Sequence, residues 1–268
     1  MRLYALAVYA FLYLPICIIA LFSFSEGRSA ASMQGFTFDW YLRALKNPFV
    51  MEALWTSVRV AFLSAFMATV VGTMAALALT GMHGRVRKMF DLLVQIAVMI
   101  PGIVIGIATL IALVTVFDLV NPWFEPATGW KLSLGTGSLI GAHGMFTMSL
   151  VVLLVRGRME TLDHALIEAS SDLGATPFGT FRQVTLPQIL PAVLAGFLLA
   201  FTFSFDDFII AFFVAGAETT LPIYVFSSIR RGVTPEINAI GTMVMVASLT
   251  ILIFAQVLLR RTQAQPRR

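Results

Sequence analysis

Six long apolar runs divide this chain, and they constrain its fold more than any other feature. Each run has the length of about 20 residues that a helix needs to cross a hydrocarbon core roughly 30 Å thick. Only helices and closed barrels satisfy their backbone polar groups in that environment. We therefore expect an all-α integral membrane protein with one domain, residues 1–268. The six predicted transmembrane helices are Leu3–Phe24, Val58–Thr80, Leu92–Phe117, Leu134–Val155, Ile189–Ala215 and Ala239–Leu259.

The composition agrees with a membrane protein. Hydrophobic residues make up 59% of the chain, charged residues make up only 12%, and the mean hydropathy is +0.89. A soluble domain has a far more polar composition. The first apolar run follows Met1 and Arg2 directly, but it is longer than the apolar region of about 7 to 15 residues in a secretory signal. We therefore expect this run to be a retained helix.

The positions of lysine and arginine predict the orientation. Cytoplasmic loops carry the excess of these residues, and the short loop Gly81–Lys88 is rich in them. We therefore predict that both termini are cytoplasmic. The same side would hold Arg2, Arg85, Arg87, Lys88, Arg156, Arg158, Arg182, Arg260, Arg261, Arg267 and Arg268. These charges are scattered over helix ends and lack the continuous stripe that is typical of a nucleic-acid-binding surface.

Residues that carry enzyme chemistry are few. Cys17 is the only cysteine, which excludes an internal disulfide, and it lies within the first apolar run. His83, His143 and His164 are far apart in sequence, so we expect no metal site. The chain also lacks a phosphate-binding loop and a nucleophile elbow. We expect no enzyme activity and no bound cofactor, and energy would come from another chain or from an ion gradient.

A polar insert, residues 156–188, separates the fourth and fifth predicted helices. Glu160 and Asp163 suit the positive end of a helix dipole. Gly174 is a natural helix stop, and Thr176-Pro177 is typical of an N-cap followed by proline at the first helical position. Helical spacing predicts one apolar stripe of Leu162, Ala165, Leu166, Ala169 and Leu173. The insert is therefore predicted to be a helical hairpin, which either covers the membrane or its own bundle or docks onto a partner.

The residue order in this hairpin resembles the signature of permease subunits of ATP-binding-cassette (ABC) importers with the type I fold. The signature is Glu-Ala-Ala, three residues, Gly, nine residues, Ile, one residue, Leu-Pro. This chain has Glu168-Ala169-Ser170, Gly174, Val184 and Leu186-Pro187 at those places, with serine for alanine and valine for isoleucine. The resemblance implies that residues 156–188, here called the coupling hairpin, dock in a groove of an ATPase subunit.

Individual residues of the coupling hairpin have predicted roles. The small residues Ala169, Ser170 and Gly174 allow two helices to approach closely, which suits insertion into a cleft. Glu168 offers a carboxylate to a basic residue of the ATPase. We therefore predict that Glu168 forms an ion pair between the subunits.

The C-terminal third resembles the second permease chain of spermidine/putrescine transporters. This resemblance rests on four stretches, Ser204–Asp207, Phe213–Gly216, Thr220–Pro222 and Gly232–Ala239. It implies a polyamine permease in a bacterial inner membrane. It also implies three kinds of partner: a second, homologous permease chain, two copies of an ATPase that binds ATP and Mg²⁺, and a soluble binding protein outside the membrane.

Two adjacent carboxylates near the outer end of the fifth predicted helix favour the same substrate. A carboxylate at the centre of a membrane helix costs on the order of 2.5 to 3.5 kcal/mol, so it usually faces a cavity or a partner. Asp206 shares a helix face with Thr202, which lies one turn before it, whereas Asp207 shares its face with Phe203. We predict that Asp206 and Thr202 line the substrate pathway and that Asp207 is structural or lies at an interface.

Three further features remain open. Both aspartates could instead cap a helix break or pair with Arg230 and Arg231. Tyr224 is a candidate for a cation-π contact with a polyamine. Pro101-Gly102 is predicted to loosen or kink the third helix, either for packing or for alternating access.

Other functions also remain open. A permease of the same family could carry an amino-acid derivative, an organophosphonate or iron, and a homodimer could replace the heterodimer. A secondary transporter would leave the coupling hairpin unexplained. An intramembrane enzyme would need a catalytic constellation that is not found in the sequence.

Overall fold

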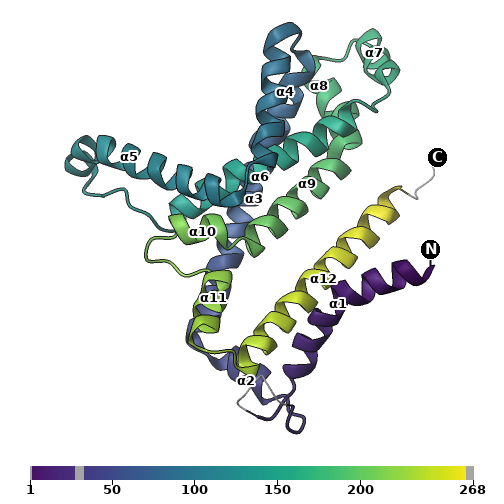
Figure 1. Cartoon of the computed structure of the whole chain (residues 1–268). Helices are drawn as coiled ribbons and strands as arrows, with labels where there is room; N and C mark the ends of the chain where they lie inside the picture. Colours follow the sequence, from purple (N-terminus) through teal and green to yellow (C-terminus); the bar gives the residue numbers. More distant parts are fainter. Residues whose placement is uncertain (1, 28–32, 264–268) are drawn as a thin grey trace. The chain divides into compact units, whose positions relative to one another are not determined.

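The computed structural model describes residues 2–27 and 33–263, and the regular structure of that part is entirely helical (Figure 1). The predicted all-α class is confirmed. The chain divides into two compact units, Thr56–Glu218 and the combination of Met1–Trp55 with Thr219–Arg268. Of the arginines predicted to be cytoplasmic, Arg267 and Arg268 lie outside the described residues, as do the side chains of Arg2, Arg260 and Arg261.

The unit Thr56–Glu218, here called the central unit, contains most of the long helices. Its first helix, α3, begins in the other unit and ends in this one. In chain order the elements are α3 (Pro48–Gly81), α4 (Gly84–Met99), α5 (Gly102–Thr128), α6 (Thr136–Met159), α7 (His164–Asp172), α8 (Pro177–Thr180), a π-helical turn η1 (Phe181–Thr185), α9 (Leu186–Asp206) and α10 (Ile209–Val214).

The second unit, here called the terminal unit, joins the two ends of the chain. It contains α1 (Arg2–Phe22), α2 (Asp39–Lys46), α11 (Leu221–Arg231) and α12 (Pro235–Gln263). Helix α12 packs against both α1 and α2. On α2, Trp40 and Ala44 are buried, and the indole nitrogen of Trp40 donates to the carbonyl of Ser25 at 2.7 Å. These contacts tie the segment that follows α1 to α2.

Five helices of the described chain have the length and composition to cross a membrane. They contain Tyr4–Phe22, Pro48–Gly81, Gly102–Thr128, Thr136–Met159 and Pro177–Asp206. The sixth predicted helix, Ala239–Leu259, lies within α12, but α12 is not among the five. A multi-pass helical protein is therefore confirmed, whereas the count of six stays a prediction.

The third predicted helix, Leu92–Phe117, has the wrong boundaries. Helix α4 ends at Met99, and α5 begins at Gly102. The residue before a proline avoids helical backbone angles, and proline has no N–H to continue the helix. Accordingly, Ile100 is extended, with φ −67° and ψ 131°, and Pro101 is extended as well. Pro101 thus breaks the helix completely, where only a kink or a loosening was predicted.

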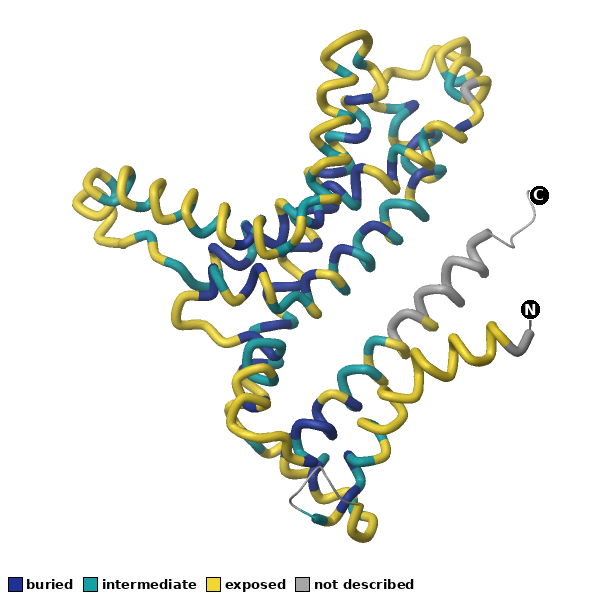
Figure 2. Tube along the Cα trace, in the orientation of Figure 1, coloured by how far each residue is buried: buried dark blue, intermediate teal, exposed yellow. Residues whose placement is uncertain are grey.

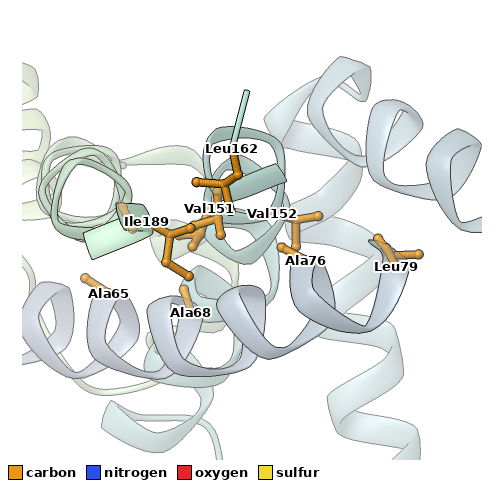
Figure 3. Close-up of a cluster of buried hydrophobic side chains, with 10 residues drawn as sticks. Ala65, Ala68, Ala76, Leu79, Val151, Val152, Leu162 and Ile189 are labelled. Carbon is orange, nitrogen blue, oxygen red and sulfur yellow. The ribbon is translucent and has the colours of Figure 1, made fainter. Parts of the chain in front are cut away.

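The core of the central unit lies where α3, α6 and α9 meet (Figure 3). Small residues of α3, such as Ala65 and Ala68, face Val151 of α6 and Ile189 of α9, and all four are buried. Without a hydrophobic driving force between helices in lipid, such close packing by small residues holds membrane helices together. Two glycines, Gly72 and Gly196, extend the close approach around Val151.

Helix α1, in contrast to the core helices, is mostly exposed. None of the residues in its apolar stretch Tyr4–Phe22 is buried, and Figure 2 shows most of the helix as exposed. Although α12 contacts it, an apolar helix with so much exposed surface needs lipid or another protein around it. This exposure supports the interpretation of α1 as a membrane helix whose exposed surface is covered by lipid or by a partner chain.

The close approach of α3 to α6 predicts a strong effect of Gly72→Ala. A Cβ at Gly72 would lie 3.0 Å from the backbone oxygen of Met148 and 3.0 Å from Cβ of Val151. We expect overpacking of this kind to cost about 1 to 3 kcal/mol and to lower the thermal unfolding temperature of the purified protein in detergent. The matched control is Gly141→Ala on α6, where an added Cβ meets nothing within 4 Å. Equal unfolding temperatures for the two variants would contradict the packing described here.

Candidate functional site

The coupling hairpin folds locally as its residue pattern predicts. The side chain of Asp163 caps α7 by accepting from the N–H of Ala165 at 3.0 Å. The chain then turns at Gly174, whose φ of +77° favours glycine. The side chain of Thr176 caps α8 by accepting from the N–H of Gly179 at 3.2 Å, and Pro177 is the first residue of that helix. The predicted order of helix, turn and short helix is confirmed.

The second half of the hairpin continues into the membrane helix without an end. Helix α8 runs into the π-helical turn η1, and η1 runs into α9 at Leu186. Pro187, at the second position of α9, has no N–H to donate, and it directly follows the wider π-helical turn, in which the N–H of Leu186 donates to the carbonyl of Phe181 five residues earlier. The two hairpin helices are joined by Ser170 of α7 and Thr180 of α8, whose hydroxyl oxygens lie 3.0 Å apart.

The predicted apolar stripe lies mostly on the outside. Leu162 is buried, but Ala165, Leu166 and Ala169 are exposed, and Leu173 at the turn is 88% exposed. Phe178 on α8, five residues after Leu173, is 72% exposed. A helical tip with exposed apolar residues is typical of a protein interface. The hairpin therefore does not use this stripe to cover its own unit.

The charged residue at the signature position is also free to meet a partner. Glu168 is exposed, and no hydrogen bond or ion pair involves its carboxylate in the part of the chain that the structure describes. Val184 of the signature lies in η1, where its carbonyl accepts from the side chain of Gln188 at 3.0 Å. The signature residues thus divide into an exposed group on α7 and a helical junction at the start of α9.

Ion pairs that sequence reasoning missed hold α4 against α6 at the start of the coupling hairpin. The guanidinium of Arg156 on α6 donates to both carboxylate oxygens of Asp91 on α4 and to Glu160, the latter at 3.3 Å. Arg87 adds weaker contacts to Asp91 at 4.0 Å and to Glu160 at 3.9 Å. A bidentate arginine–carboxylate pair also fixes orientation, so this network positions the helix from which the hairpin emerges.

At its other end, α9 stops between the two adjacent carboxylates. The fifth predicted helix, Ile189–Ala215, is wrong as one continuous element, because α9 ends at Asp206 and α10 begins at Ile209. The reason is the side chain of Asp207. Its Oδ2 accepts from the N–H of Ile210 at 2.9 Å and of Ala211 at 3.1 Å. A side chain that takes these donors replaces the backbone acceptors of a continuous helix.

The two aspartates therefore have different surroundings. Asp207 is partly buried and caps α10, whereas Asp206 is exposed and has no hydrogen-bond or ion-pair partner within residues 33–263 as described. The hydroxyl of Thr202 donates within α9, to the backbone carbonyl of Leu198 at 2.9 Å. Only Asp206 of these three presents a free polar group.

Tyr224 lies in the terminal unit, on α11. Its hydroxyl is 3.5 Å from the side-chain nitrogen of Asn47, which also donates to Glu236 at 3.2 Å. Tyr224 is half-buried and takes part in a polar contact of its own unit. Its predicted cation-π role stays a prediction.

A buried polar contact beside Asp207 escaped the sequence reasoning. His143 of α6 is 2% exposed, its Nδ1 lies 2.8 Å from the hydroxyl of Ser204 on α9, and its Nε2 lies 3.5 Å from Oδ2 of Asp207. The signal available in the sequence was an ionisable residue inside a predicted membrane helix, which by default marks a functional or pairing position.

Relatives of this chain are found among curated transport proteins. It is 36% identical over 255 residues to the "Spermidine/putrescine transport system permease protein PotC" of Haemophilus influenzae, covering 95% of this chain and 94% of the relative. It is 35% identical over 260 residues to the "Putrescine transport system permease protein PotI" of Escherichia coli K12, covering 96% and 89%.

Solved structures share the fold at lower identity. A chain of a bacterial ABC transporter involved in the import of alginate aligns with a TM-score of 0.75 at 16% identity, covering 97% of this chain and 95% of the other. A chain of the MetNI methionine ABC transporter aligns with a TM-score of 0.58 at 19% identity, covering 81% and 99%.

A family model described as "Binding-protein-dependent transport system inner membrane component" matches residues 68–267. This range begins in α3 and includes the coupling hairpin, the helix break at Asp207 and all of α12. Together with the identity over nearly the whole chain, the match shows that this protein belongs to the family of inner membrane components of binding-protein-dependent transport systems.

Proposed function

We propose that this chain is the permease subunit of an ABC importer for polyamines and forms half of the translocation pathway. The observation that carries the proposal is the identity of 35 to 36% to polyamine permeases over about 95% of the chain. The free carboxylate of Asp206 at a helix break supports it, because an exposed anionic group within a membrane helix attracts a cationic substrate. A half-helix C-terminus adds partial negative charge at the same place.

The proposed assembly has three further kinds of component. A second, homologous permease chain would complete the pathway, two copies of an ATPase would bind ATP and Mg²⁺, and a soluble binding protein would deliver the polyamine. A solved alginate transporter described as a complex with a "periplasmic protein" supports a partner of the last kind. Both termini are proposed to be cytoplasmic, and this chain itself is proposed to bind no cofactor and to catalyse no reaction.

The coupling hairpin is the proposed contact with the ATPase. Its exposed Leu173, Phe178 and Glu168 combine an apolar tip with one free carboxylate, which suits a groove with apolar walls and a basic residue. Because α8 continues through η1 into α9, a force on the hairpin would pass along α9 to Asp206. A secondary transporter of the same shape would leave this exposed tip without a role.

A second candidate is a permease of the same family for another small solute, such as an amino-acid derivative, an organophosphonate or iron. The fold permits it, since the similar structures belong to transporters of alginate and methionine. The two candidates separate when the chain is purified with its ATPase and binding protein, reconstituted in liposomes, and tested for ATP-dependent uptake of labelled spermidine and putrescine. Uptake of a non-amine solute with no uptake of either polyamine would overturn the proposal.

We predict that Gly174→Asp uncouples ATP hydrolysis from transport. The residue sits at φ +77° with nothing within 4 Å of an added Cβ, so the new side chain would project from the hairpin tip into the proposed groove. Uptake should fall while the protein remains folded. Measured quantities are uptake, ATP hydrolysis and co-purification of the ATPase.

The matched control for that variant is Gly84→Asp. Gly84 has φ +73° and also has nothing within 4 Å of an added Cβ, but it lies at the start of α4. It carries the same backbone strain and the same charge outside the coupling hairpin, so it should keep most of the uptake. Equal losses in both variants would assign the effect to strain and would remove the docking role of Gly174.

We predict that Asp206→Asn weakens polyamine uptake far more than Asp39→Asn, a control at an exposed position of α2. Loss of one charge-assisted contact of about 1.5 to 3 kcal/mol corresponds to a rise in the KM for uptake of roughly 10- to 100-fold. Basal ATP hydrolysis should not change. A KM within twofold of the wild-type value would remove Asp206 from the pathway.

A further inference from the structure

The break between α9 and α10 is held by a polar cluster from three places in the sequence. His143 belongs to α6, Ser204 to the last turn of α9, and Asp207 to the break itself. All three belong to the central unit, in which α6 packs against both α9 and α10 (Figure 1). One imidazole ring therefore contacts the helix before the break and the residue within it.

Of the two neutral tautomers of the His143 imidazole, one avoids repulsion with the Asp207 carboxylate. If Nδ1 carried the hydrogen, Nε2 would present a lone pair to the Asp207 carboxylate only 3.5 Å away, and the two would repel. If the Ser204 hydroxyl donates to Nδ1 at 2.8 Å, Nε2 carries the hydrogen and points it at Oδ2 of Asp207. This second tautomer avoids the repulsion, and in it His143 links the Ser204 hydroxyl on α9 to the carboxylate in the break.

The link from Nε2 to Asp207 is not closed to hydrogen-bond distance. Nε2 is buried and has no hydrogen-bond partner in the described structure, although the nearest carboxylate oxygen is 3.5 Å away. That oxygen also accepts from the N–H groups of Ile210 and Ala211. A small shift of the break would close or open the contact, and burial of an unpaired polar group carries a cost that favours closure.

A second contact holds the far end of α10 on the same helix. The hydroxyl of Ser138 on α6, shared with the carbonyl of Gly135, lies 2.7 Å from the carbonyl of Val214, the last residue of α10. Just beyond, a Cβ at Gly216 would lie 2.5 Å from the backbone oxygen of Leu134. Helix α10 is thus held on α6 by a closed hydrogen bond at its C-terminal end, whereas the contact at the break is open, so the break is the adjustable point.

We propose that His143 is a positioning residue for transport: with Ser204 and Asp207 it forms a latch that fixes the helix break and thereby sets where the Asp206 carboxylate stands. Asp206 is the neighbour of the latched residue, and its own side chain makes no contact that would hold it. Its place depends on the backbone at Asp207, which the latch controls. The transport consequence rests on the proposed function, whereas the latch itself is a statement about the structure.

The test of the latch uses a readout that needs no substrate. In a Cys17→Ser background, Asp206→Cys provides the single thiol, because Cys17 is the only cysteine of the chain. The rate of its reaction with a charged maleimide is measured in the detergent-solubilised full transporter by following the mass of this chain alone. His143→Leu, which removes both polar contacts, should change this rate by roughly 3- to 10-fold, the range that corresponds to the one closed hydrogen bond that is lost.

Two companion variants separate positioning from folding. His143→Gln keeps an amide that can accept and donate, and it should restore the rate at least partly. Thr147→Val is the matched control one turn along α6, since the Thr147 hydroxyl donates to the carbonyl of His143 at 2.7 Å and lies outside the latch. It should leave the rate unchanged. An equal change in Thr147→Val and His143→Leu, or no change in His143→Leu, would overturn the latch.

Uptake by the cysteine-free chain with Asp206 intact then tests the consequence. His143→Leu should raise the KM for spermidine with little change in basal ATP hydrolysis, and Asp207→Asn combined with it should add less than the sum of the single effects. If the wild-type transporter moves no polyamine while the thiol rates behave as expected, the latch stands and the proposed function fails. Additive effects on KM would overturn the positioning role of His143.

Discussion

The need to satisfy backbone hydrogen bonds where no water is available governs the architecture of this protein. A helix in hydrocarbon can end only where another group takes over its donors and acceptors. The chain meets this requirement at the end of α9, where Oδ2 of Asp207 accepts from the first N–H groups of α10. The Asp207 carboxylate would be costly in a continuous membrane helix, but here it stabilises the helix break by accepting these hydrogen bonds. The carboxylate of Asp206 beside it makes no such bond in the described part of the chain.

The close packing of α3, α6 and α9 fixes the helix on which the segment after the break is held. Small residues let the three helices approach around Val151, and α6 then contributes His143 and Ser138 to the segment after the break. At the opposite end of α9, the helix is continuous with η1 and α8 of the coupling hairpin. Helix α9, of 21 residues and about 31 Å at 1.5 Å per residue, therefore connects an exposed apolar tip with a free carboxylate.

The parts that sequence reasoning predicted well are those that depend on neighbouring residues. The caps of α7 and α8 at Asp163 and Thr176, and the turn at Gly174, use contacts within three residues of the chain. The boundaries of the third and fifth predicted helices were wrong for a related reason. Long apolar composition hid two local signals, the proline at position 101 and the capping aspartate at position 207.

The sequence by itself determined the class of this protein, its apolar helices and the coupling hairpin with its signature residues, because hydropathy, capping and turn preferences act over short stretches of chain. Only the tertiary structure decided that His143 and Ser204 lie beside Asp207 and that Arg156 holds α4 to α6. The partners of those contacts, His143 with Ser204 and Asp91 with Arg156, are 61 and 65 residues apart. No local preference encodes such a pair, since only the packing of α6 against α4 and α9 brings the side chains together.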